Sequence, residues 1–397
     1  MASEARFMFI GLLFLILKAA SAQQLGEYNV KAYGASGDGK TDSTKAFQDA
    51  WKESCATEGK PRIVIPEGKY LVGPLVFEGP CKGTQVIELR GELLASTDLS
   101  SYESNWIQFE YIDGLIITGN GKFNGQGAIA WPHNECPKRW SCKLLPTSLV
   151  FSNVTEATIT GITSLDPKLF HMQVFRSHDM TFNSIWVTAP GDSPNTDGLH
   201  IAESSNIVIN NAVIGTGDDC ISIGPGNRNL SISGVTCGPG HGISVGSLGK
   251  TAGENDVVGL TVTNCTFVGT SNGLRIKSWQ SSVSALKASG FHYEDIVMKD
   301  VYNPIIIDQE YCPYVSCPEK DPSLVKITDV TFKNIRGTSL AEEAIKLVCS
   351  ASNPCEGVQL QDIHFEYTGD KPNANFKSTC VNAHGSSNDN VNPDSCF

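Results

Sequence analysis

The chain of 397 residues carries little charge, since Asp, Glu, Lys and Arg together make up 18% of the sequence. A coiled coil typically contains roughly half Ala, Glu, Lys, Leu and Arg, so that class is excluded. Basic residues are the scarcer kind: 30 Lys and Arg stand against 42 Asp and Glu, and the formal net charge is -12. We therefore expect no nucleic-acid partner and no binding to an anionic membrane, and a polyanionic ligand would need local basic residues.

Apolar runs of the roughly 20 residues that a membrane-spanning helix needs are also missing. A shorter apolar run at 7–17 follows Arg6 and precedes small residues at 20–22. This layout predicts a signal peptide over residues 1–22, and the run is too short to favour the alternative of a signal anchor. We expect a secreted protein, extracellular or in a cell wall and free of the membrane, with residues 23–397 as a single domain.

The paired Cys-x-x-Cys and Cys/His spacings that are typical of zinc sites are absent as well. In an oxidising compartment the 13 cysteines should instead form disulfides, and their odd number leaves one over. The expected pairs are Cys220 with Cys237, Cys349 with Cys355, and Cys380 with Cys396. Three N-glycosylation sequons predict a glycoprotein, and they begin at Asn153, Asn229 and Asn264.

One spacing of apolar residues, h-x-h-x-x-h-x-h, recurs down the chain. Its copies begin at residues 157, 180, 207, 230, 260, 291, 325 and 358. Only the first copy lapses, at Ser164. The two central positions hold residues that tolerate turn or left-handed backbone, such as Thr328 and Asp329. Each copy therefore predicts two short strands that meet at a bend. Cys265 takes an inward position in its copy and is the cysteine that we expect to be unpaired.

The intervals between copies are too long for a hairpin meander, and no helical periodicity fills them. A coil of parallel strands that stacks on the next coil satisfies this pattern. We therefore predict an all-β fold, a single right-handed parallel β-helix. The competing β-propeller needs antiparallel hairpins and repeats of about 40 residues. Residues 42–51 predict a capped amphipathic helix, with Phe47 and Trp51 on one face, that covers the N-terminal end.

A second recurring segment, G-h-x-h with one Cys-for-Gly exception, predicts one further strand per coil. Its first apolar residues are Leu199, Ile221, Ile243 and Leu274. If these residues stack in register, the residues two positions earlier form a column with a backbone spacing of about 4.8 Å. That column consists of Asp197, Asp219, His241 and Asn272. Asp218 adjoins the column, and Arg275 and Lys277 lie on one side of the fourth strand.

Carboxylates this close cannot all ionise freely, so at least one should have a raised pKa and stay protonated in weakly acidic solution. A protonated acid beside an ionised one supplies what hydrolysis of a glycosidic bond needs, namely a proton for the leaving oxygen and a base for water. Arg275 and Lys277 could then bind an anionic sugar.

Two other interpretations of the acids are open. Asp commonly caps bends in a β-helix, and clustered carboxylates can bind calcium. The alignment on consecutive coils favours a site, and two adjoining cations and a histidine disfavour a metal. The remaining histidines show no such alignment, and we expect structural or exposed positions for His133, His171, His178, His200, His292, His364 and His384.

Four ordered motifs resemble those of the polygalacturonases, pectin-degrading glycoside hydrolases with a right-handed parallel β-helix. They are Asn195-Thr196-Asp197-Gly198, Gly217-Asp218-Asp219, Gly240-His241-Gly242 and Arg275-Ile276-Lys277. The resemblance runs from about Tyr28 to the C-terminus. It implies a polygalacturonate or pectin substrate, no cofactor, and hydrolysis of α-1,4-galacturonosyl linkages with inversion.

The resemblance also implies roles for the site residues. Asp218 would be the general acid, Asp197 and Asp219 would position and deprotonate the attacking water, and His241 would tune the protonation of the acid. The implied substrate-binding residues are Arg275, Lys277, Tyr311 and Asn195. Inversion is associated with carboxyls about 6.5 to 9.5 Å apart, whereas a spacing of one coil predicts a shorter distance.

Within the family the chain looks most like the plant pollen exopolygalacturonases, because its similar region begins soon after the signal peptide and it ends on Cys396-Phe397. We expect a monomer that acts from the non-reducing end. The alternatives are an endo-acting polygalacturonase, a relative that cleaves rhamnogalacturonan, a pectate lyase, and a non-catalytic cell-wall carbohydrate-binding protein. A lyase would need a calcium site and a strong base, and the acid cluster counts against a binding protein.

Overall fold

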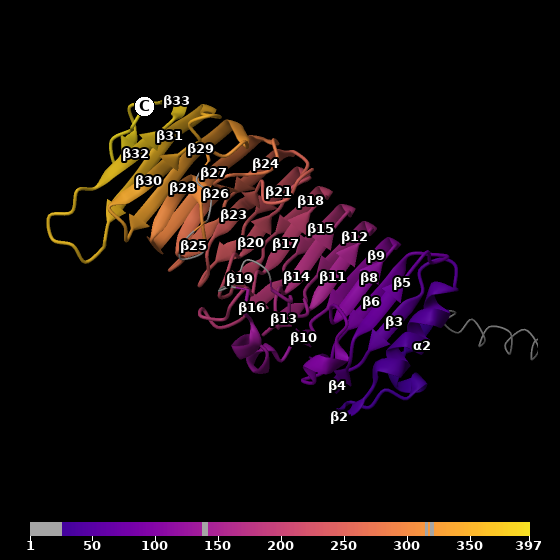
Figure 1. The fold of residues 1–397 in the computed structure, drawn as a ribbon. Coiled ribbons are helices and arrows are strands. Elements are labelled where there is room, and N and C mark those ends of the chain that lie inside the picture. Colours follow the sequence, from indigo (N-terminus) through magenta and orange to yellow (C-terminus); the bar gives the residue numbers. More distant parts are fainter. Residues whose placement is uncertain (1–25, 137–141, 314–316, 318–320) are drawn as a thin grey trace, which may run out of the picture.

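The computed structural model describes residues 26–136, 142–313, 317 and 321–397. Figure 1 shows an elongated stack of coils that runs from the helix α2 at the indigo end to the yellow C-terminal strands. The predicted signal peptide lies outside the described residues. Among the described residues, no helix has the length and apolar character needed to cross a membrane.

One parallel sheet extends along the stack, and we call it the site sheet. Its strands in spatial order are β5 (Leu75–Glu78), β8 (Ile107–Glu110), β11 (Leu149–Ser152), β14 (Met172–Phe175), β17 (Leu199–Ala202), β20 (Ile221–Ile223), β23 (Ile243–Leu248), β26 (Asn272–Trp279), β28 (Asn303–Tyr311), β30 (Glu343–Val348) and β32 (Lys377–Val381). Each strand pairs in parallel with strands of the neighbouring coils.

Two further parallel ladders complete the coils. One contains β1 (Glu27–Asn29), β3 (Arg62–Ile65), β6 (Gln85–Leu89), β9 (Asp113–Gly119), β12 (Thr155–Thr160), β15 (His178–Asn183), β18 (Ser205–Asn210), β21 (Arg228–Ser233) and β24 (Val257–Thr263). The other contains β2 (Asp38–Asp42), β4 (Lys69–Val72), β7 (Glu92–Ala95), β10 (Lys122–Asn124), β13 (Thr163–Leu165), β16 (Trp186–Thr188), β19 (Val213–Gly215), β22 (Thr236–Cys237) and β25 (Thr266–Val268).

In the C-terminal coils, long bent strands serve both ladders. They are β27 (Lys287–Val301), β29 (Lys326–Ser339) and β31 (Cys355–Tyr367), and the last of them pairs with β33 (Ala383–Ser387) and β34 (Val391–Asn392). Helical segments are short and lie between strands: η1 (Val30–Tyr33), α2 (Thr44–Cys55), η2 (Leu99–Ser101), η3 (Gly127–Ile129) and η4 (Trp131–His133).

The predicted apolar copies stack in register. Their first positions pair in the order Ala157, Met180, Ile207, Leu230, Leu260 and Phe291. The second central residue has a left-handed backbone, as at Asn211 (φ 52°) and Asn264 (φ 52°), so the two strands of a copy do meet at a bend. The prediction of an all-β, right-handed parallel β-helix is confirmed.

The copy predicted to begin at residue 325 is wrong. Phe291 pairs with Val330, and Val330 pairs with Val358, so the stacked copy begins at 330. This coil turns at two left-handed positions, Asp329 (φ 57°) and Asn334 (φ 48°). Because apolar residues flank both turns at a similar spacing, the sequence pattern fits either turn, and only pairing with the neighbouring coils distinguishes them.

The inward side chains form one apolar core along the stack. Phe77, Phe109 and Phe151 come from successive site-sheet strands, and the centroids of neighbouring rings lie 5.2 Å apart. All three are buried. Burial of one such side chain contributes about 1.5–3 kcal/mol. A one-residue slip would turn these side chains outward, so the core fixes the register of every coil.

Helix α2 covers the N-terminal end of this core (Figure 1). Phe47 and Trp51 are buried on one face, as predicted. Ser43 makes no side-chain hydrogen bond to the start of the helix. Asp42 caps it instead, because its Oδ1 accepts a hydrogen bond from the backbone N of Thr44 at 2.8 Å.

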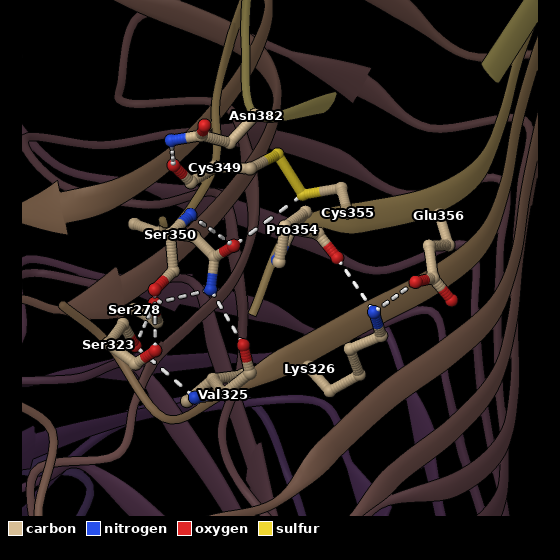
Figure 2. Close-up of a disulfide and its surroundings, with 11 residues drawn as sticks. Ser278, Ser323, Val325, Lys326, Cys349, Ser350, Pro354, Cys355, Glu356 and Asn382 are labelled. Carbon is tan, nitrogen blue, oxygen red and sulfur yellow. Dashed lines mark hydrogen bonds and ion pairs between the residues drawn. A yellow bond between two sulfur atoms is a disulfide. The ribbon is translucent and has the colours of Figure 1, made fainter. Parts of the chain in front are cut away.

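The three predicted disulfides are confirmed, and Cys265 is buried and unpaired. The other disulfides of the described residues are Cys55–Cys81, Cys136–Cys142 and Cys312–Cys317. Figure 2 shows the Cys349–Cys355 disulfide in the C-terminal coils. Asn382 donates to the carbonyl of Cys349, and Lys326 donates to the carbonyl of Pro354. The loop that the disulfide closes is therefore also held by polar contacts.

Candidate active site

The predicted column forms where three neighbouring site-sheet strands begin. β17, β20 and β23 are in register at their first apolar residues. Asp197, Asp219 and His241 each precede these residues by two positions, so they lie on successive coils. The backbone N of Gly198 donates to the carbonyl of Asp219 at 2.9 Å. A Cβ on Gly198 would lie 2.4 Å from the carbonyl oxygen of Cys220, so the approach of the two coils requires glycine.

Asp219 is held as an anion between two cations. Its Oδ1 accepts hydrogen bonds from Arg275 Nη2 and Ser244 Oγ, both at 2.7 Å. Its Oδ2 accepts from Lys277 Nζ at 2.9 Å. Burial opposes ionisation, but the charges of Lys277 and Arg275 outweigh it and hold the pKa of Asp219 well below its ordinary value. Both predicted substrate-binding cations thus have Asp219 as a partner.

Asp197 differs in its protonation. It is 6% exposed, and its Oδ2 accepts a hydrogen bond from Ser222 Oγ at 2.6 Å. Burial, and then the negative charges of Asp218 and Asp219, raise the pKa of Asp197 well above its ordinary value. The Ser222 hydrogen bond and the charge of Lys277 act in the opposite direction and are outweighed. The expectation that at least one acid has a raised pKa is confirmed, at Asp197.

Asp218 is the most exposed of the three acids, with 20% of its side chain accessible. Its Oδ1 lies 2.9 Å from His241 Nδ1 and accepts from the backbone N of Asp219 at 2.8 Å. Its Oδ2 accepts from Asn195 Nδ2 at 3.3 Å, and Asn195 accepts in turn from Asn134 at 3.0 Å. An oxygen of Asp218 lies within 4.8 Å of one of Asp219, its neighbour in the sequence, and of a ring nitrogen of His241 on the next coil.

The three acids line a cleft of about 230 Å³. The predicted residues Asn195, Lys277 and Tyr311 line it too, and Lys277 Nζ lies 5.3 Å from the centroid of the Tyr311 ring. Burial raises the pKa of Tyr311 to about 12, so the phenol stays neutral and can donate a hydrogen bond. Arg275 reaches the site through its contacts with Asp219 and Ser244.

A larger cavity of about 700 Å³ adjoins the cleft on the side of the preceding coils. The cleft and the cavity share Phe170 and His200, whose rings stack with centroids 5.1 Å apart. Other lining residues of the cavity include Tyr102, Asn105, Lys143, Leu144, Thr147 and Gln173. The two hollows together offer room for more than one sugar.

Sequence reasoning missed His200, for which a structural or exposed position was expected. His200 lines the cleft, and its Nδ1 lies 2.8 Å from Ser222 Oγ. A signal was present in the sequence, because the variable position of the G-h-x-h segments forms a second column. That column consists of His200, Ser222, Ser244 and Arg275.

The donor set of Asp218, Asp219 and His241 has the proximity of a metal site, because the three ligand atoms lie within 4.8 Å of one another. Their chemistry does not fit calcium. Both oxygens of Asp219 bond to cations, and His241 Nδ1 bonds to Asp218. Calcium takes six to eight oxygen ligands and would be repelled by two neighbouring positive charges.

Three acids, His200 and Lys277 line one cleft of a parallel β-helix, and Arg275 contacts one of the acids. Such an arrangement is typical of glycoside hydrolases that use acid and base catalysis. The chain belongs to the family described as glycosyl hydrolases family 28, which matches residues 55–391. The resemblance seen in the four motifs is therefore confirmed.

Known relatives agree with this assignment. The chain is 50% identical to an exopolygalacturonase of Zea mays, over 94% of this chain and 91% of that protein. It is 45% identical to a polygalacturonase of Brassica napus, over 89% of each. The crystal structure of an exopolygalacturonase from Thermotoga maritima has the same fold, with a TM-score of 0.74 at 17% identity over 87% of this chain and 88% of that one.

Proposed function

We propose that the chain is a secreted, monomeric polygalacturonase that hydrolyses α-1,4-galacturonosyl linkages of polygalacturonate from the non-reducing end, with inversion. The observation that carries the proposal is the placement of three acids in one cleft: buried Asp197, whose pKa is raised, and buried Asp219, whose pKa two cations hold down, lie beside the more exposed Asp218. Lys277 and Arg275 supply local positive charge for a uronate in a chain of negative net charge. The names of the maize relatives support this substrate.

The proposed roles follow from exposure and charge. Asp218 is the general acid, because it is the acid that a substrate can reach most easily. It gives a proton to the leaving oxygen. The protonated Asp197 orients the attacking water, and the ionised Asp219 accepts the proton that this water loses.

Exo action is supported by the maize relatives, which are exopolygalacturonases. Asn134 donates to the side chain of Asn195 at 3.0 Å and to the carbonyl of Pro194 at 3.4 Å. Asn134 is thereby attached to the turn that precedes Asp197. Exo action needs a groove that is blocked at one end, whereas endo action needs an open groove.

Incubation with polygalacturonate, followed by sizing of the products, tests the function. We expect galacturonate monomer alone, whereas mixed oligomers would show endo action. Activity should survive EDTA without a rise in absorbance from unsaturated ends, and the opposite result would identify a pectate lyase. NMR of fresh hydrolysate should show the β-anomer first, which is the inverted product of an α-linkage. A folded protein without turnover would favour a binding protein.

A further inference from the structure

His200 is joined to Asp197 through a single hydroxyl group. Its Nδ1 lies 2.8 Å from Ser222 Oγ, and Ser222 Oγ donates to Asp197 Oδ2 at 2.6 Å. Phe170 stacks on the imidazole and restricts its position. Ser222 is 3% exposed, so its hydroxyl is largely shielded from water that could replace either partner.

The next coil contains an equivalent set of contacts, in which an arginine takes the place of the histidine. Ser244 pairs with Ser222 in the site sheet, and its Oγ donates to Asp219 Oδ1 at 2.7 Å. Arg275 Nε donates to Ser244 Oγ at 2.9 Å. Asp219 also has direct bonds to Arg275 and Lys277, whereas Ser222 is the one side chain among the described residues that forms a hydrogen bond with the Asp197 carboxyl. The orientation of the Asp197 carboxyl therefore depends on Ser222 alone among these side chains.

The single hydrogen of the Ser222 hydroxyl links the states of its two partners. When Asp197 is ionised, Ser222 donates to it and must accept a hydrogen bond from the Nδ1–H of His200. When Asp197 is protonated, it can donate to Ser222, and Ser222 can then donate to an unprotonated Nδ1. Burial lowers the pKa of His200 to about 4, so both states use neutral imidazole above that pH and differ in tautomer.

Other charged and titratable groups face Asp197 from the neighbouring coils. The like charges are those of Asp218 and Asp219, and the positive charge is that of Lys277. The remaining groups are the phenol of Tyr311, His241 behind Asp218, and His171, whose backbone N donates to the carbonyl of Asp197. These groups set the charge around Asp197, but no side-chain hydrogen bond from them to its carboxyl is observed among the described residues.

We propose that His200 is a positioning residue for Asp197 and that it acts through Ser222, whose hydroxyl it orients toward the Asp197 carboxyl. The proposal rests on the proposed hydrolase function. It adds a residue that, among the hydrogen bonds of the described residues, has none to Asp218 or Asp219 and that lies outside the four motifs of the family resemblance.

A double-mutant cycle with His200→Phe and Ser222→Ala tests the proposal. Phenylalanine keeps an aromatic ring against Phe170 but removes both nitrogens. Each single variant should lower kcat on polygalacturonate roughly 10- to 100-fold, with KM within about threefold. The double variant should fall no more than about twofold below Ser222→Ala, because His200 has no route to Asp197 once the hydroxyl is gone. Ser222→Ala should also shift the pH limb of Asp197 upward, because the hydrogen-bond donor to the ionised carboxylate is lost.

Ser244→Ala is the matched background. Since His200 has no contact with that hydroxyl, the effects of His200→Phe and Ser244→Ala should multiply. His200→Asn, which can place an amide near the former Nδ1, should recover at least part of the loss. Multiplying effects of His200→Phe and Ser222→Ala, or a change in KM alone, would overturn the proposal and make His200 a substrate contact.

Two measurements keep the result interpretable. If His200→Phe fails to fold, His200→Leu, which also lacks both ring nitrogens, gives the same cycle with Ser222→Ala and the double variant. If the wild-type protein does not turn over polygalacturonate, the proposed function fails, and NMR titration of Asp197 in labelled protein still tests the link. An Asp197 titration that is identical in wild type and His200→Phe, with Ser222→Ala shifted, would contradict it.

Discussion

Asp197 and Asp219 occupy equivalent positions on neighbouring coils, and each accepts a hydrogen bond from a serine one coil further on. They nevertheless differ in charge. The serine beside Asp219 is bonded to Arg275, and Lys277 and Arg275 contact the carboxylate directly. The serine beside Asp197 is bonded to a histidine.

The difference shows how a repeating fold produces unlike groups. Two neighbouring coils supply the same backbone position. The protonation state of each acid depends on the charge of the side chain that bonds to its serine, which is His200 for Asp197 and Arg275 for Asp219. Burial penalises both carboxylates, but only Asp219 has cations close enough to outweigh that penalty. A site that needs an acid and a base can therefore be built from two copies of one position.

The largest effect on activity is expected from a change at Asp218, the third carboxyl of the site. Asp218→Asn should lower kcat by roughly 10²- to 10⁴-fold, because the amide cannot protonate the leaving oxygen. Binding of oligogalacturonate and the melting temperature should change little, since Asp218 is partly exposed and its contacts with His241 and Asn195 are polar. Steady-state kinetics with calorimetric binding checks this prediction, and full activity in the variant would remove Asp218 from the mechanism.

Stability should separate the two equivalent acids. Asp219→Asn leaves Arg275 and Lys277 buried without their counter-charge, and it should cost about 3–5 kcal/mol in the free energy of unfolding. Asp197→Asn removes a group that is already neutral at low pH, and it should cost less than about 1 kcal/mol there. Urea unfolding of both variants measures the difference. Equal losses would show that the two carboxyls carry the same charge.

The pH dependence of the Asp197→Asn variant gives a smaller and signed effect. Because the pKa of Asp197 is raised on folding, its contribution to wild-type stability is present below the unfolded pKa and is lost as the pH rises through the folded pKa. The free energy of unfolding of the wild type should therefore fall relative to that of the variant over this window. Asp219 has the opposite sign, and its contribution is lost only as the pH falls through its lowered pKa. A pH-independent difference for Asp197→Asn would contradict this account.

Much of the site could be predicted because the spacing of the inward apolar residues determines the register between coils. Leu199 and Ile221 stack as the spacing indicated. Asp197 and Asp219, which precede them by two positions, therefore lie on neighbouring coils as predicted. The register was misjudged at residue 325, where two bends share one apolar pattern and only the contacts between coils select one. The spacing of apolar residues thus predicts which residues share a column only where the sequence pattern is compatible with a single position of the bend.

Side-chain direction was the part that the sequence could not provide. Arg275 and Lys277 were predicted to bind the substrate carboxylate, and the sequence did not indicate that both also form ion pairs with Asp219, a buried carboxylate that needs compensation. His200 was set aside because it aligns with serines and not with acids. Its connection to Asp197 passes through a hydroxyl, and serine carries no charge that would mark such a connection in a sequence.

The central claim is that Asp197 is protonated where Asp219 is ionised, and NMR titration of ¹³C-labelled aspartate carboxyls in the free protein tests it most directly. Asp197→Asn and Asp219→Asn identify the two resonances by their loss. We predict that the Asp197 resonance titrates well above the usual range of aspartate, while the Asp219 resonance shows no protonation down to the lowest pH at which the protein stays folded. Titration of both resonances at the same, ordinary pH would contradict the account.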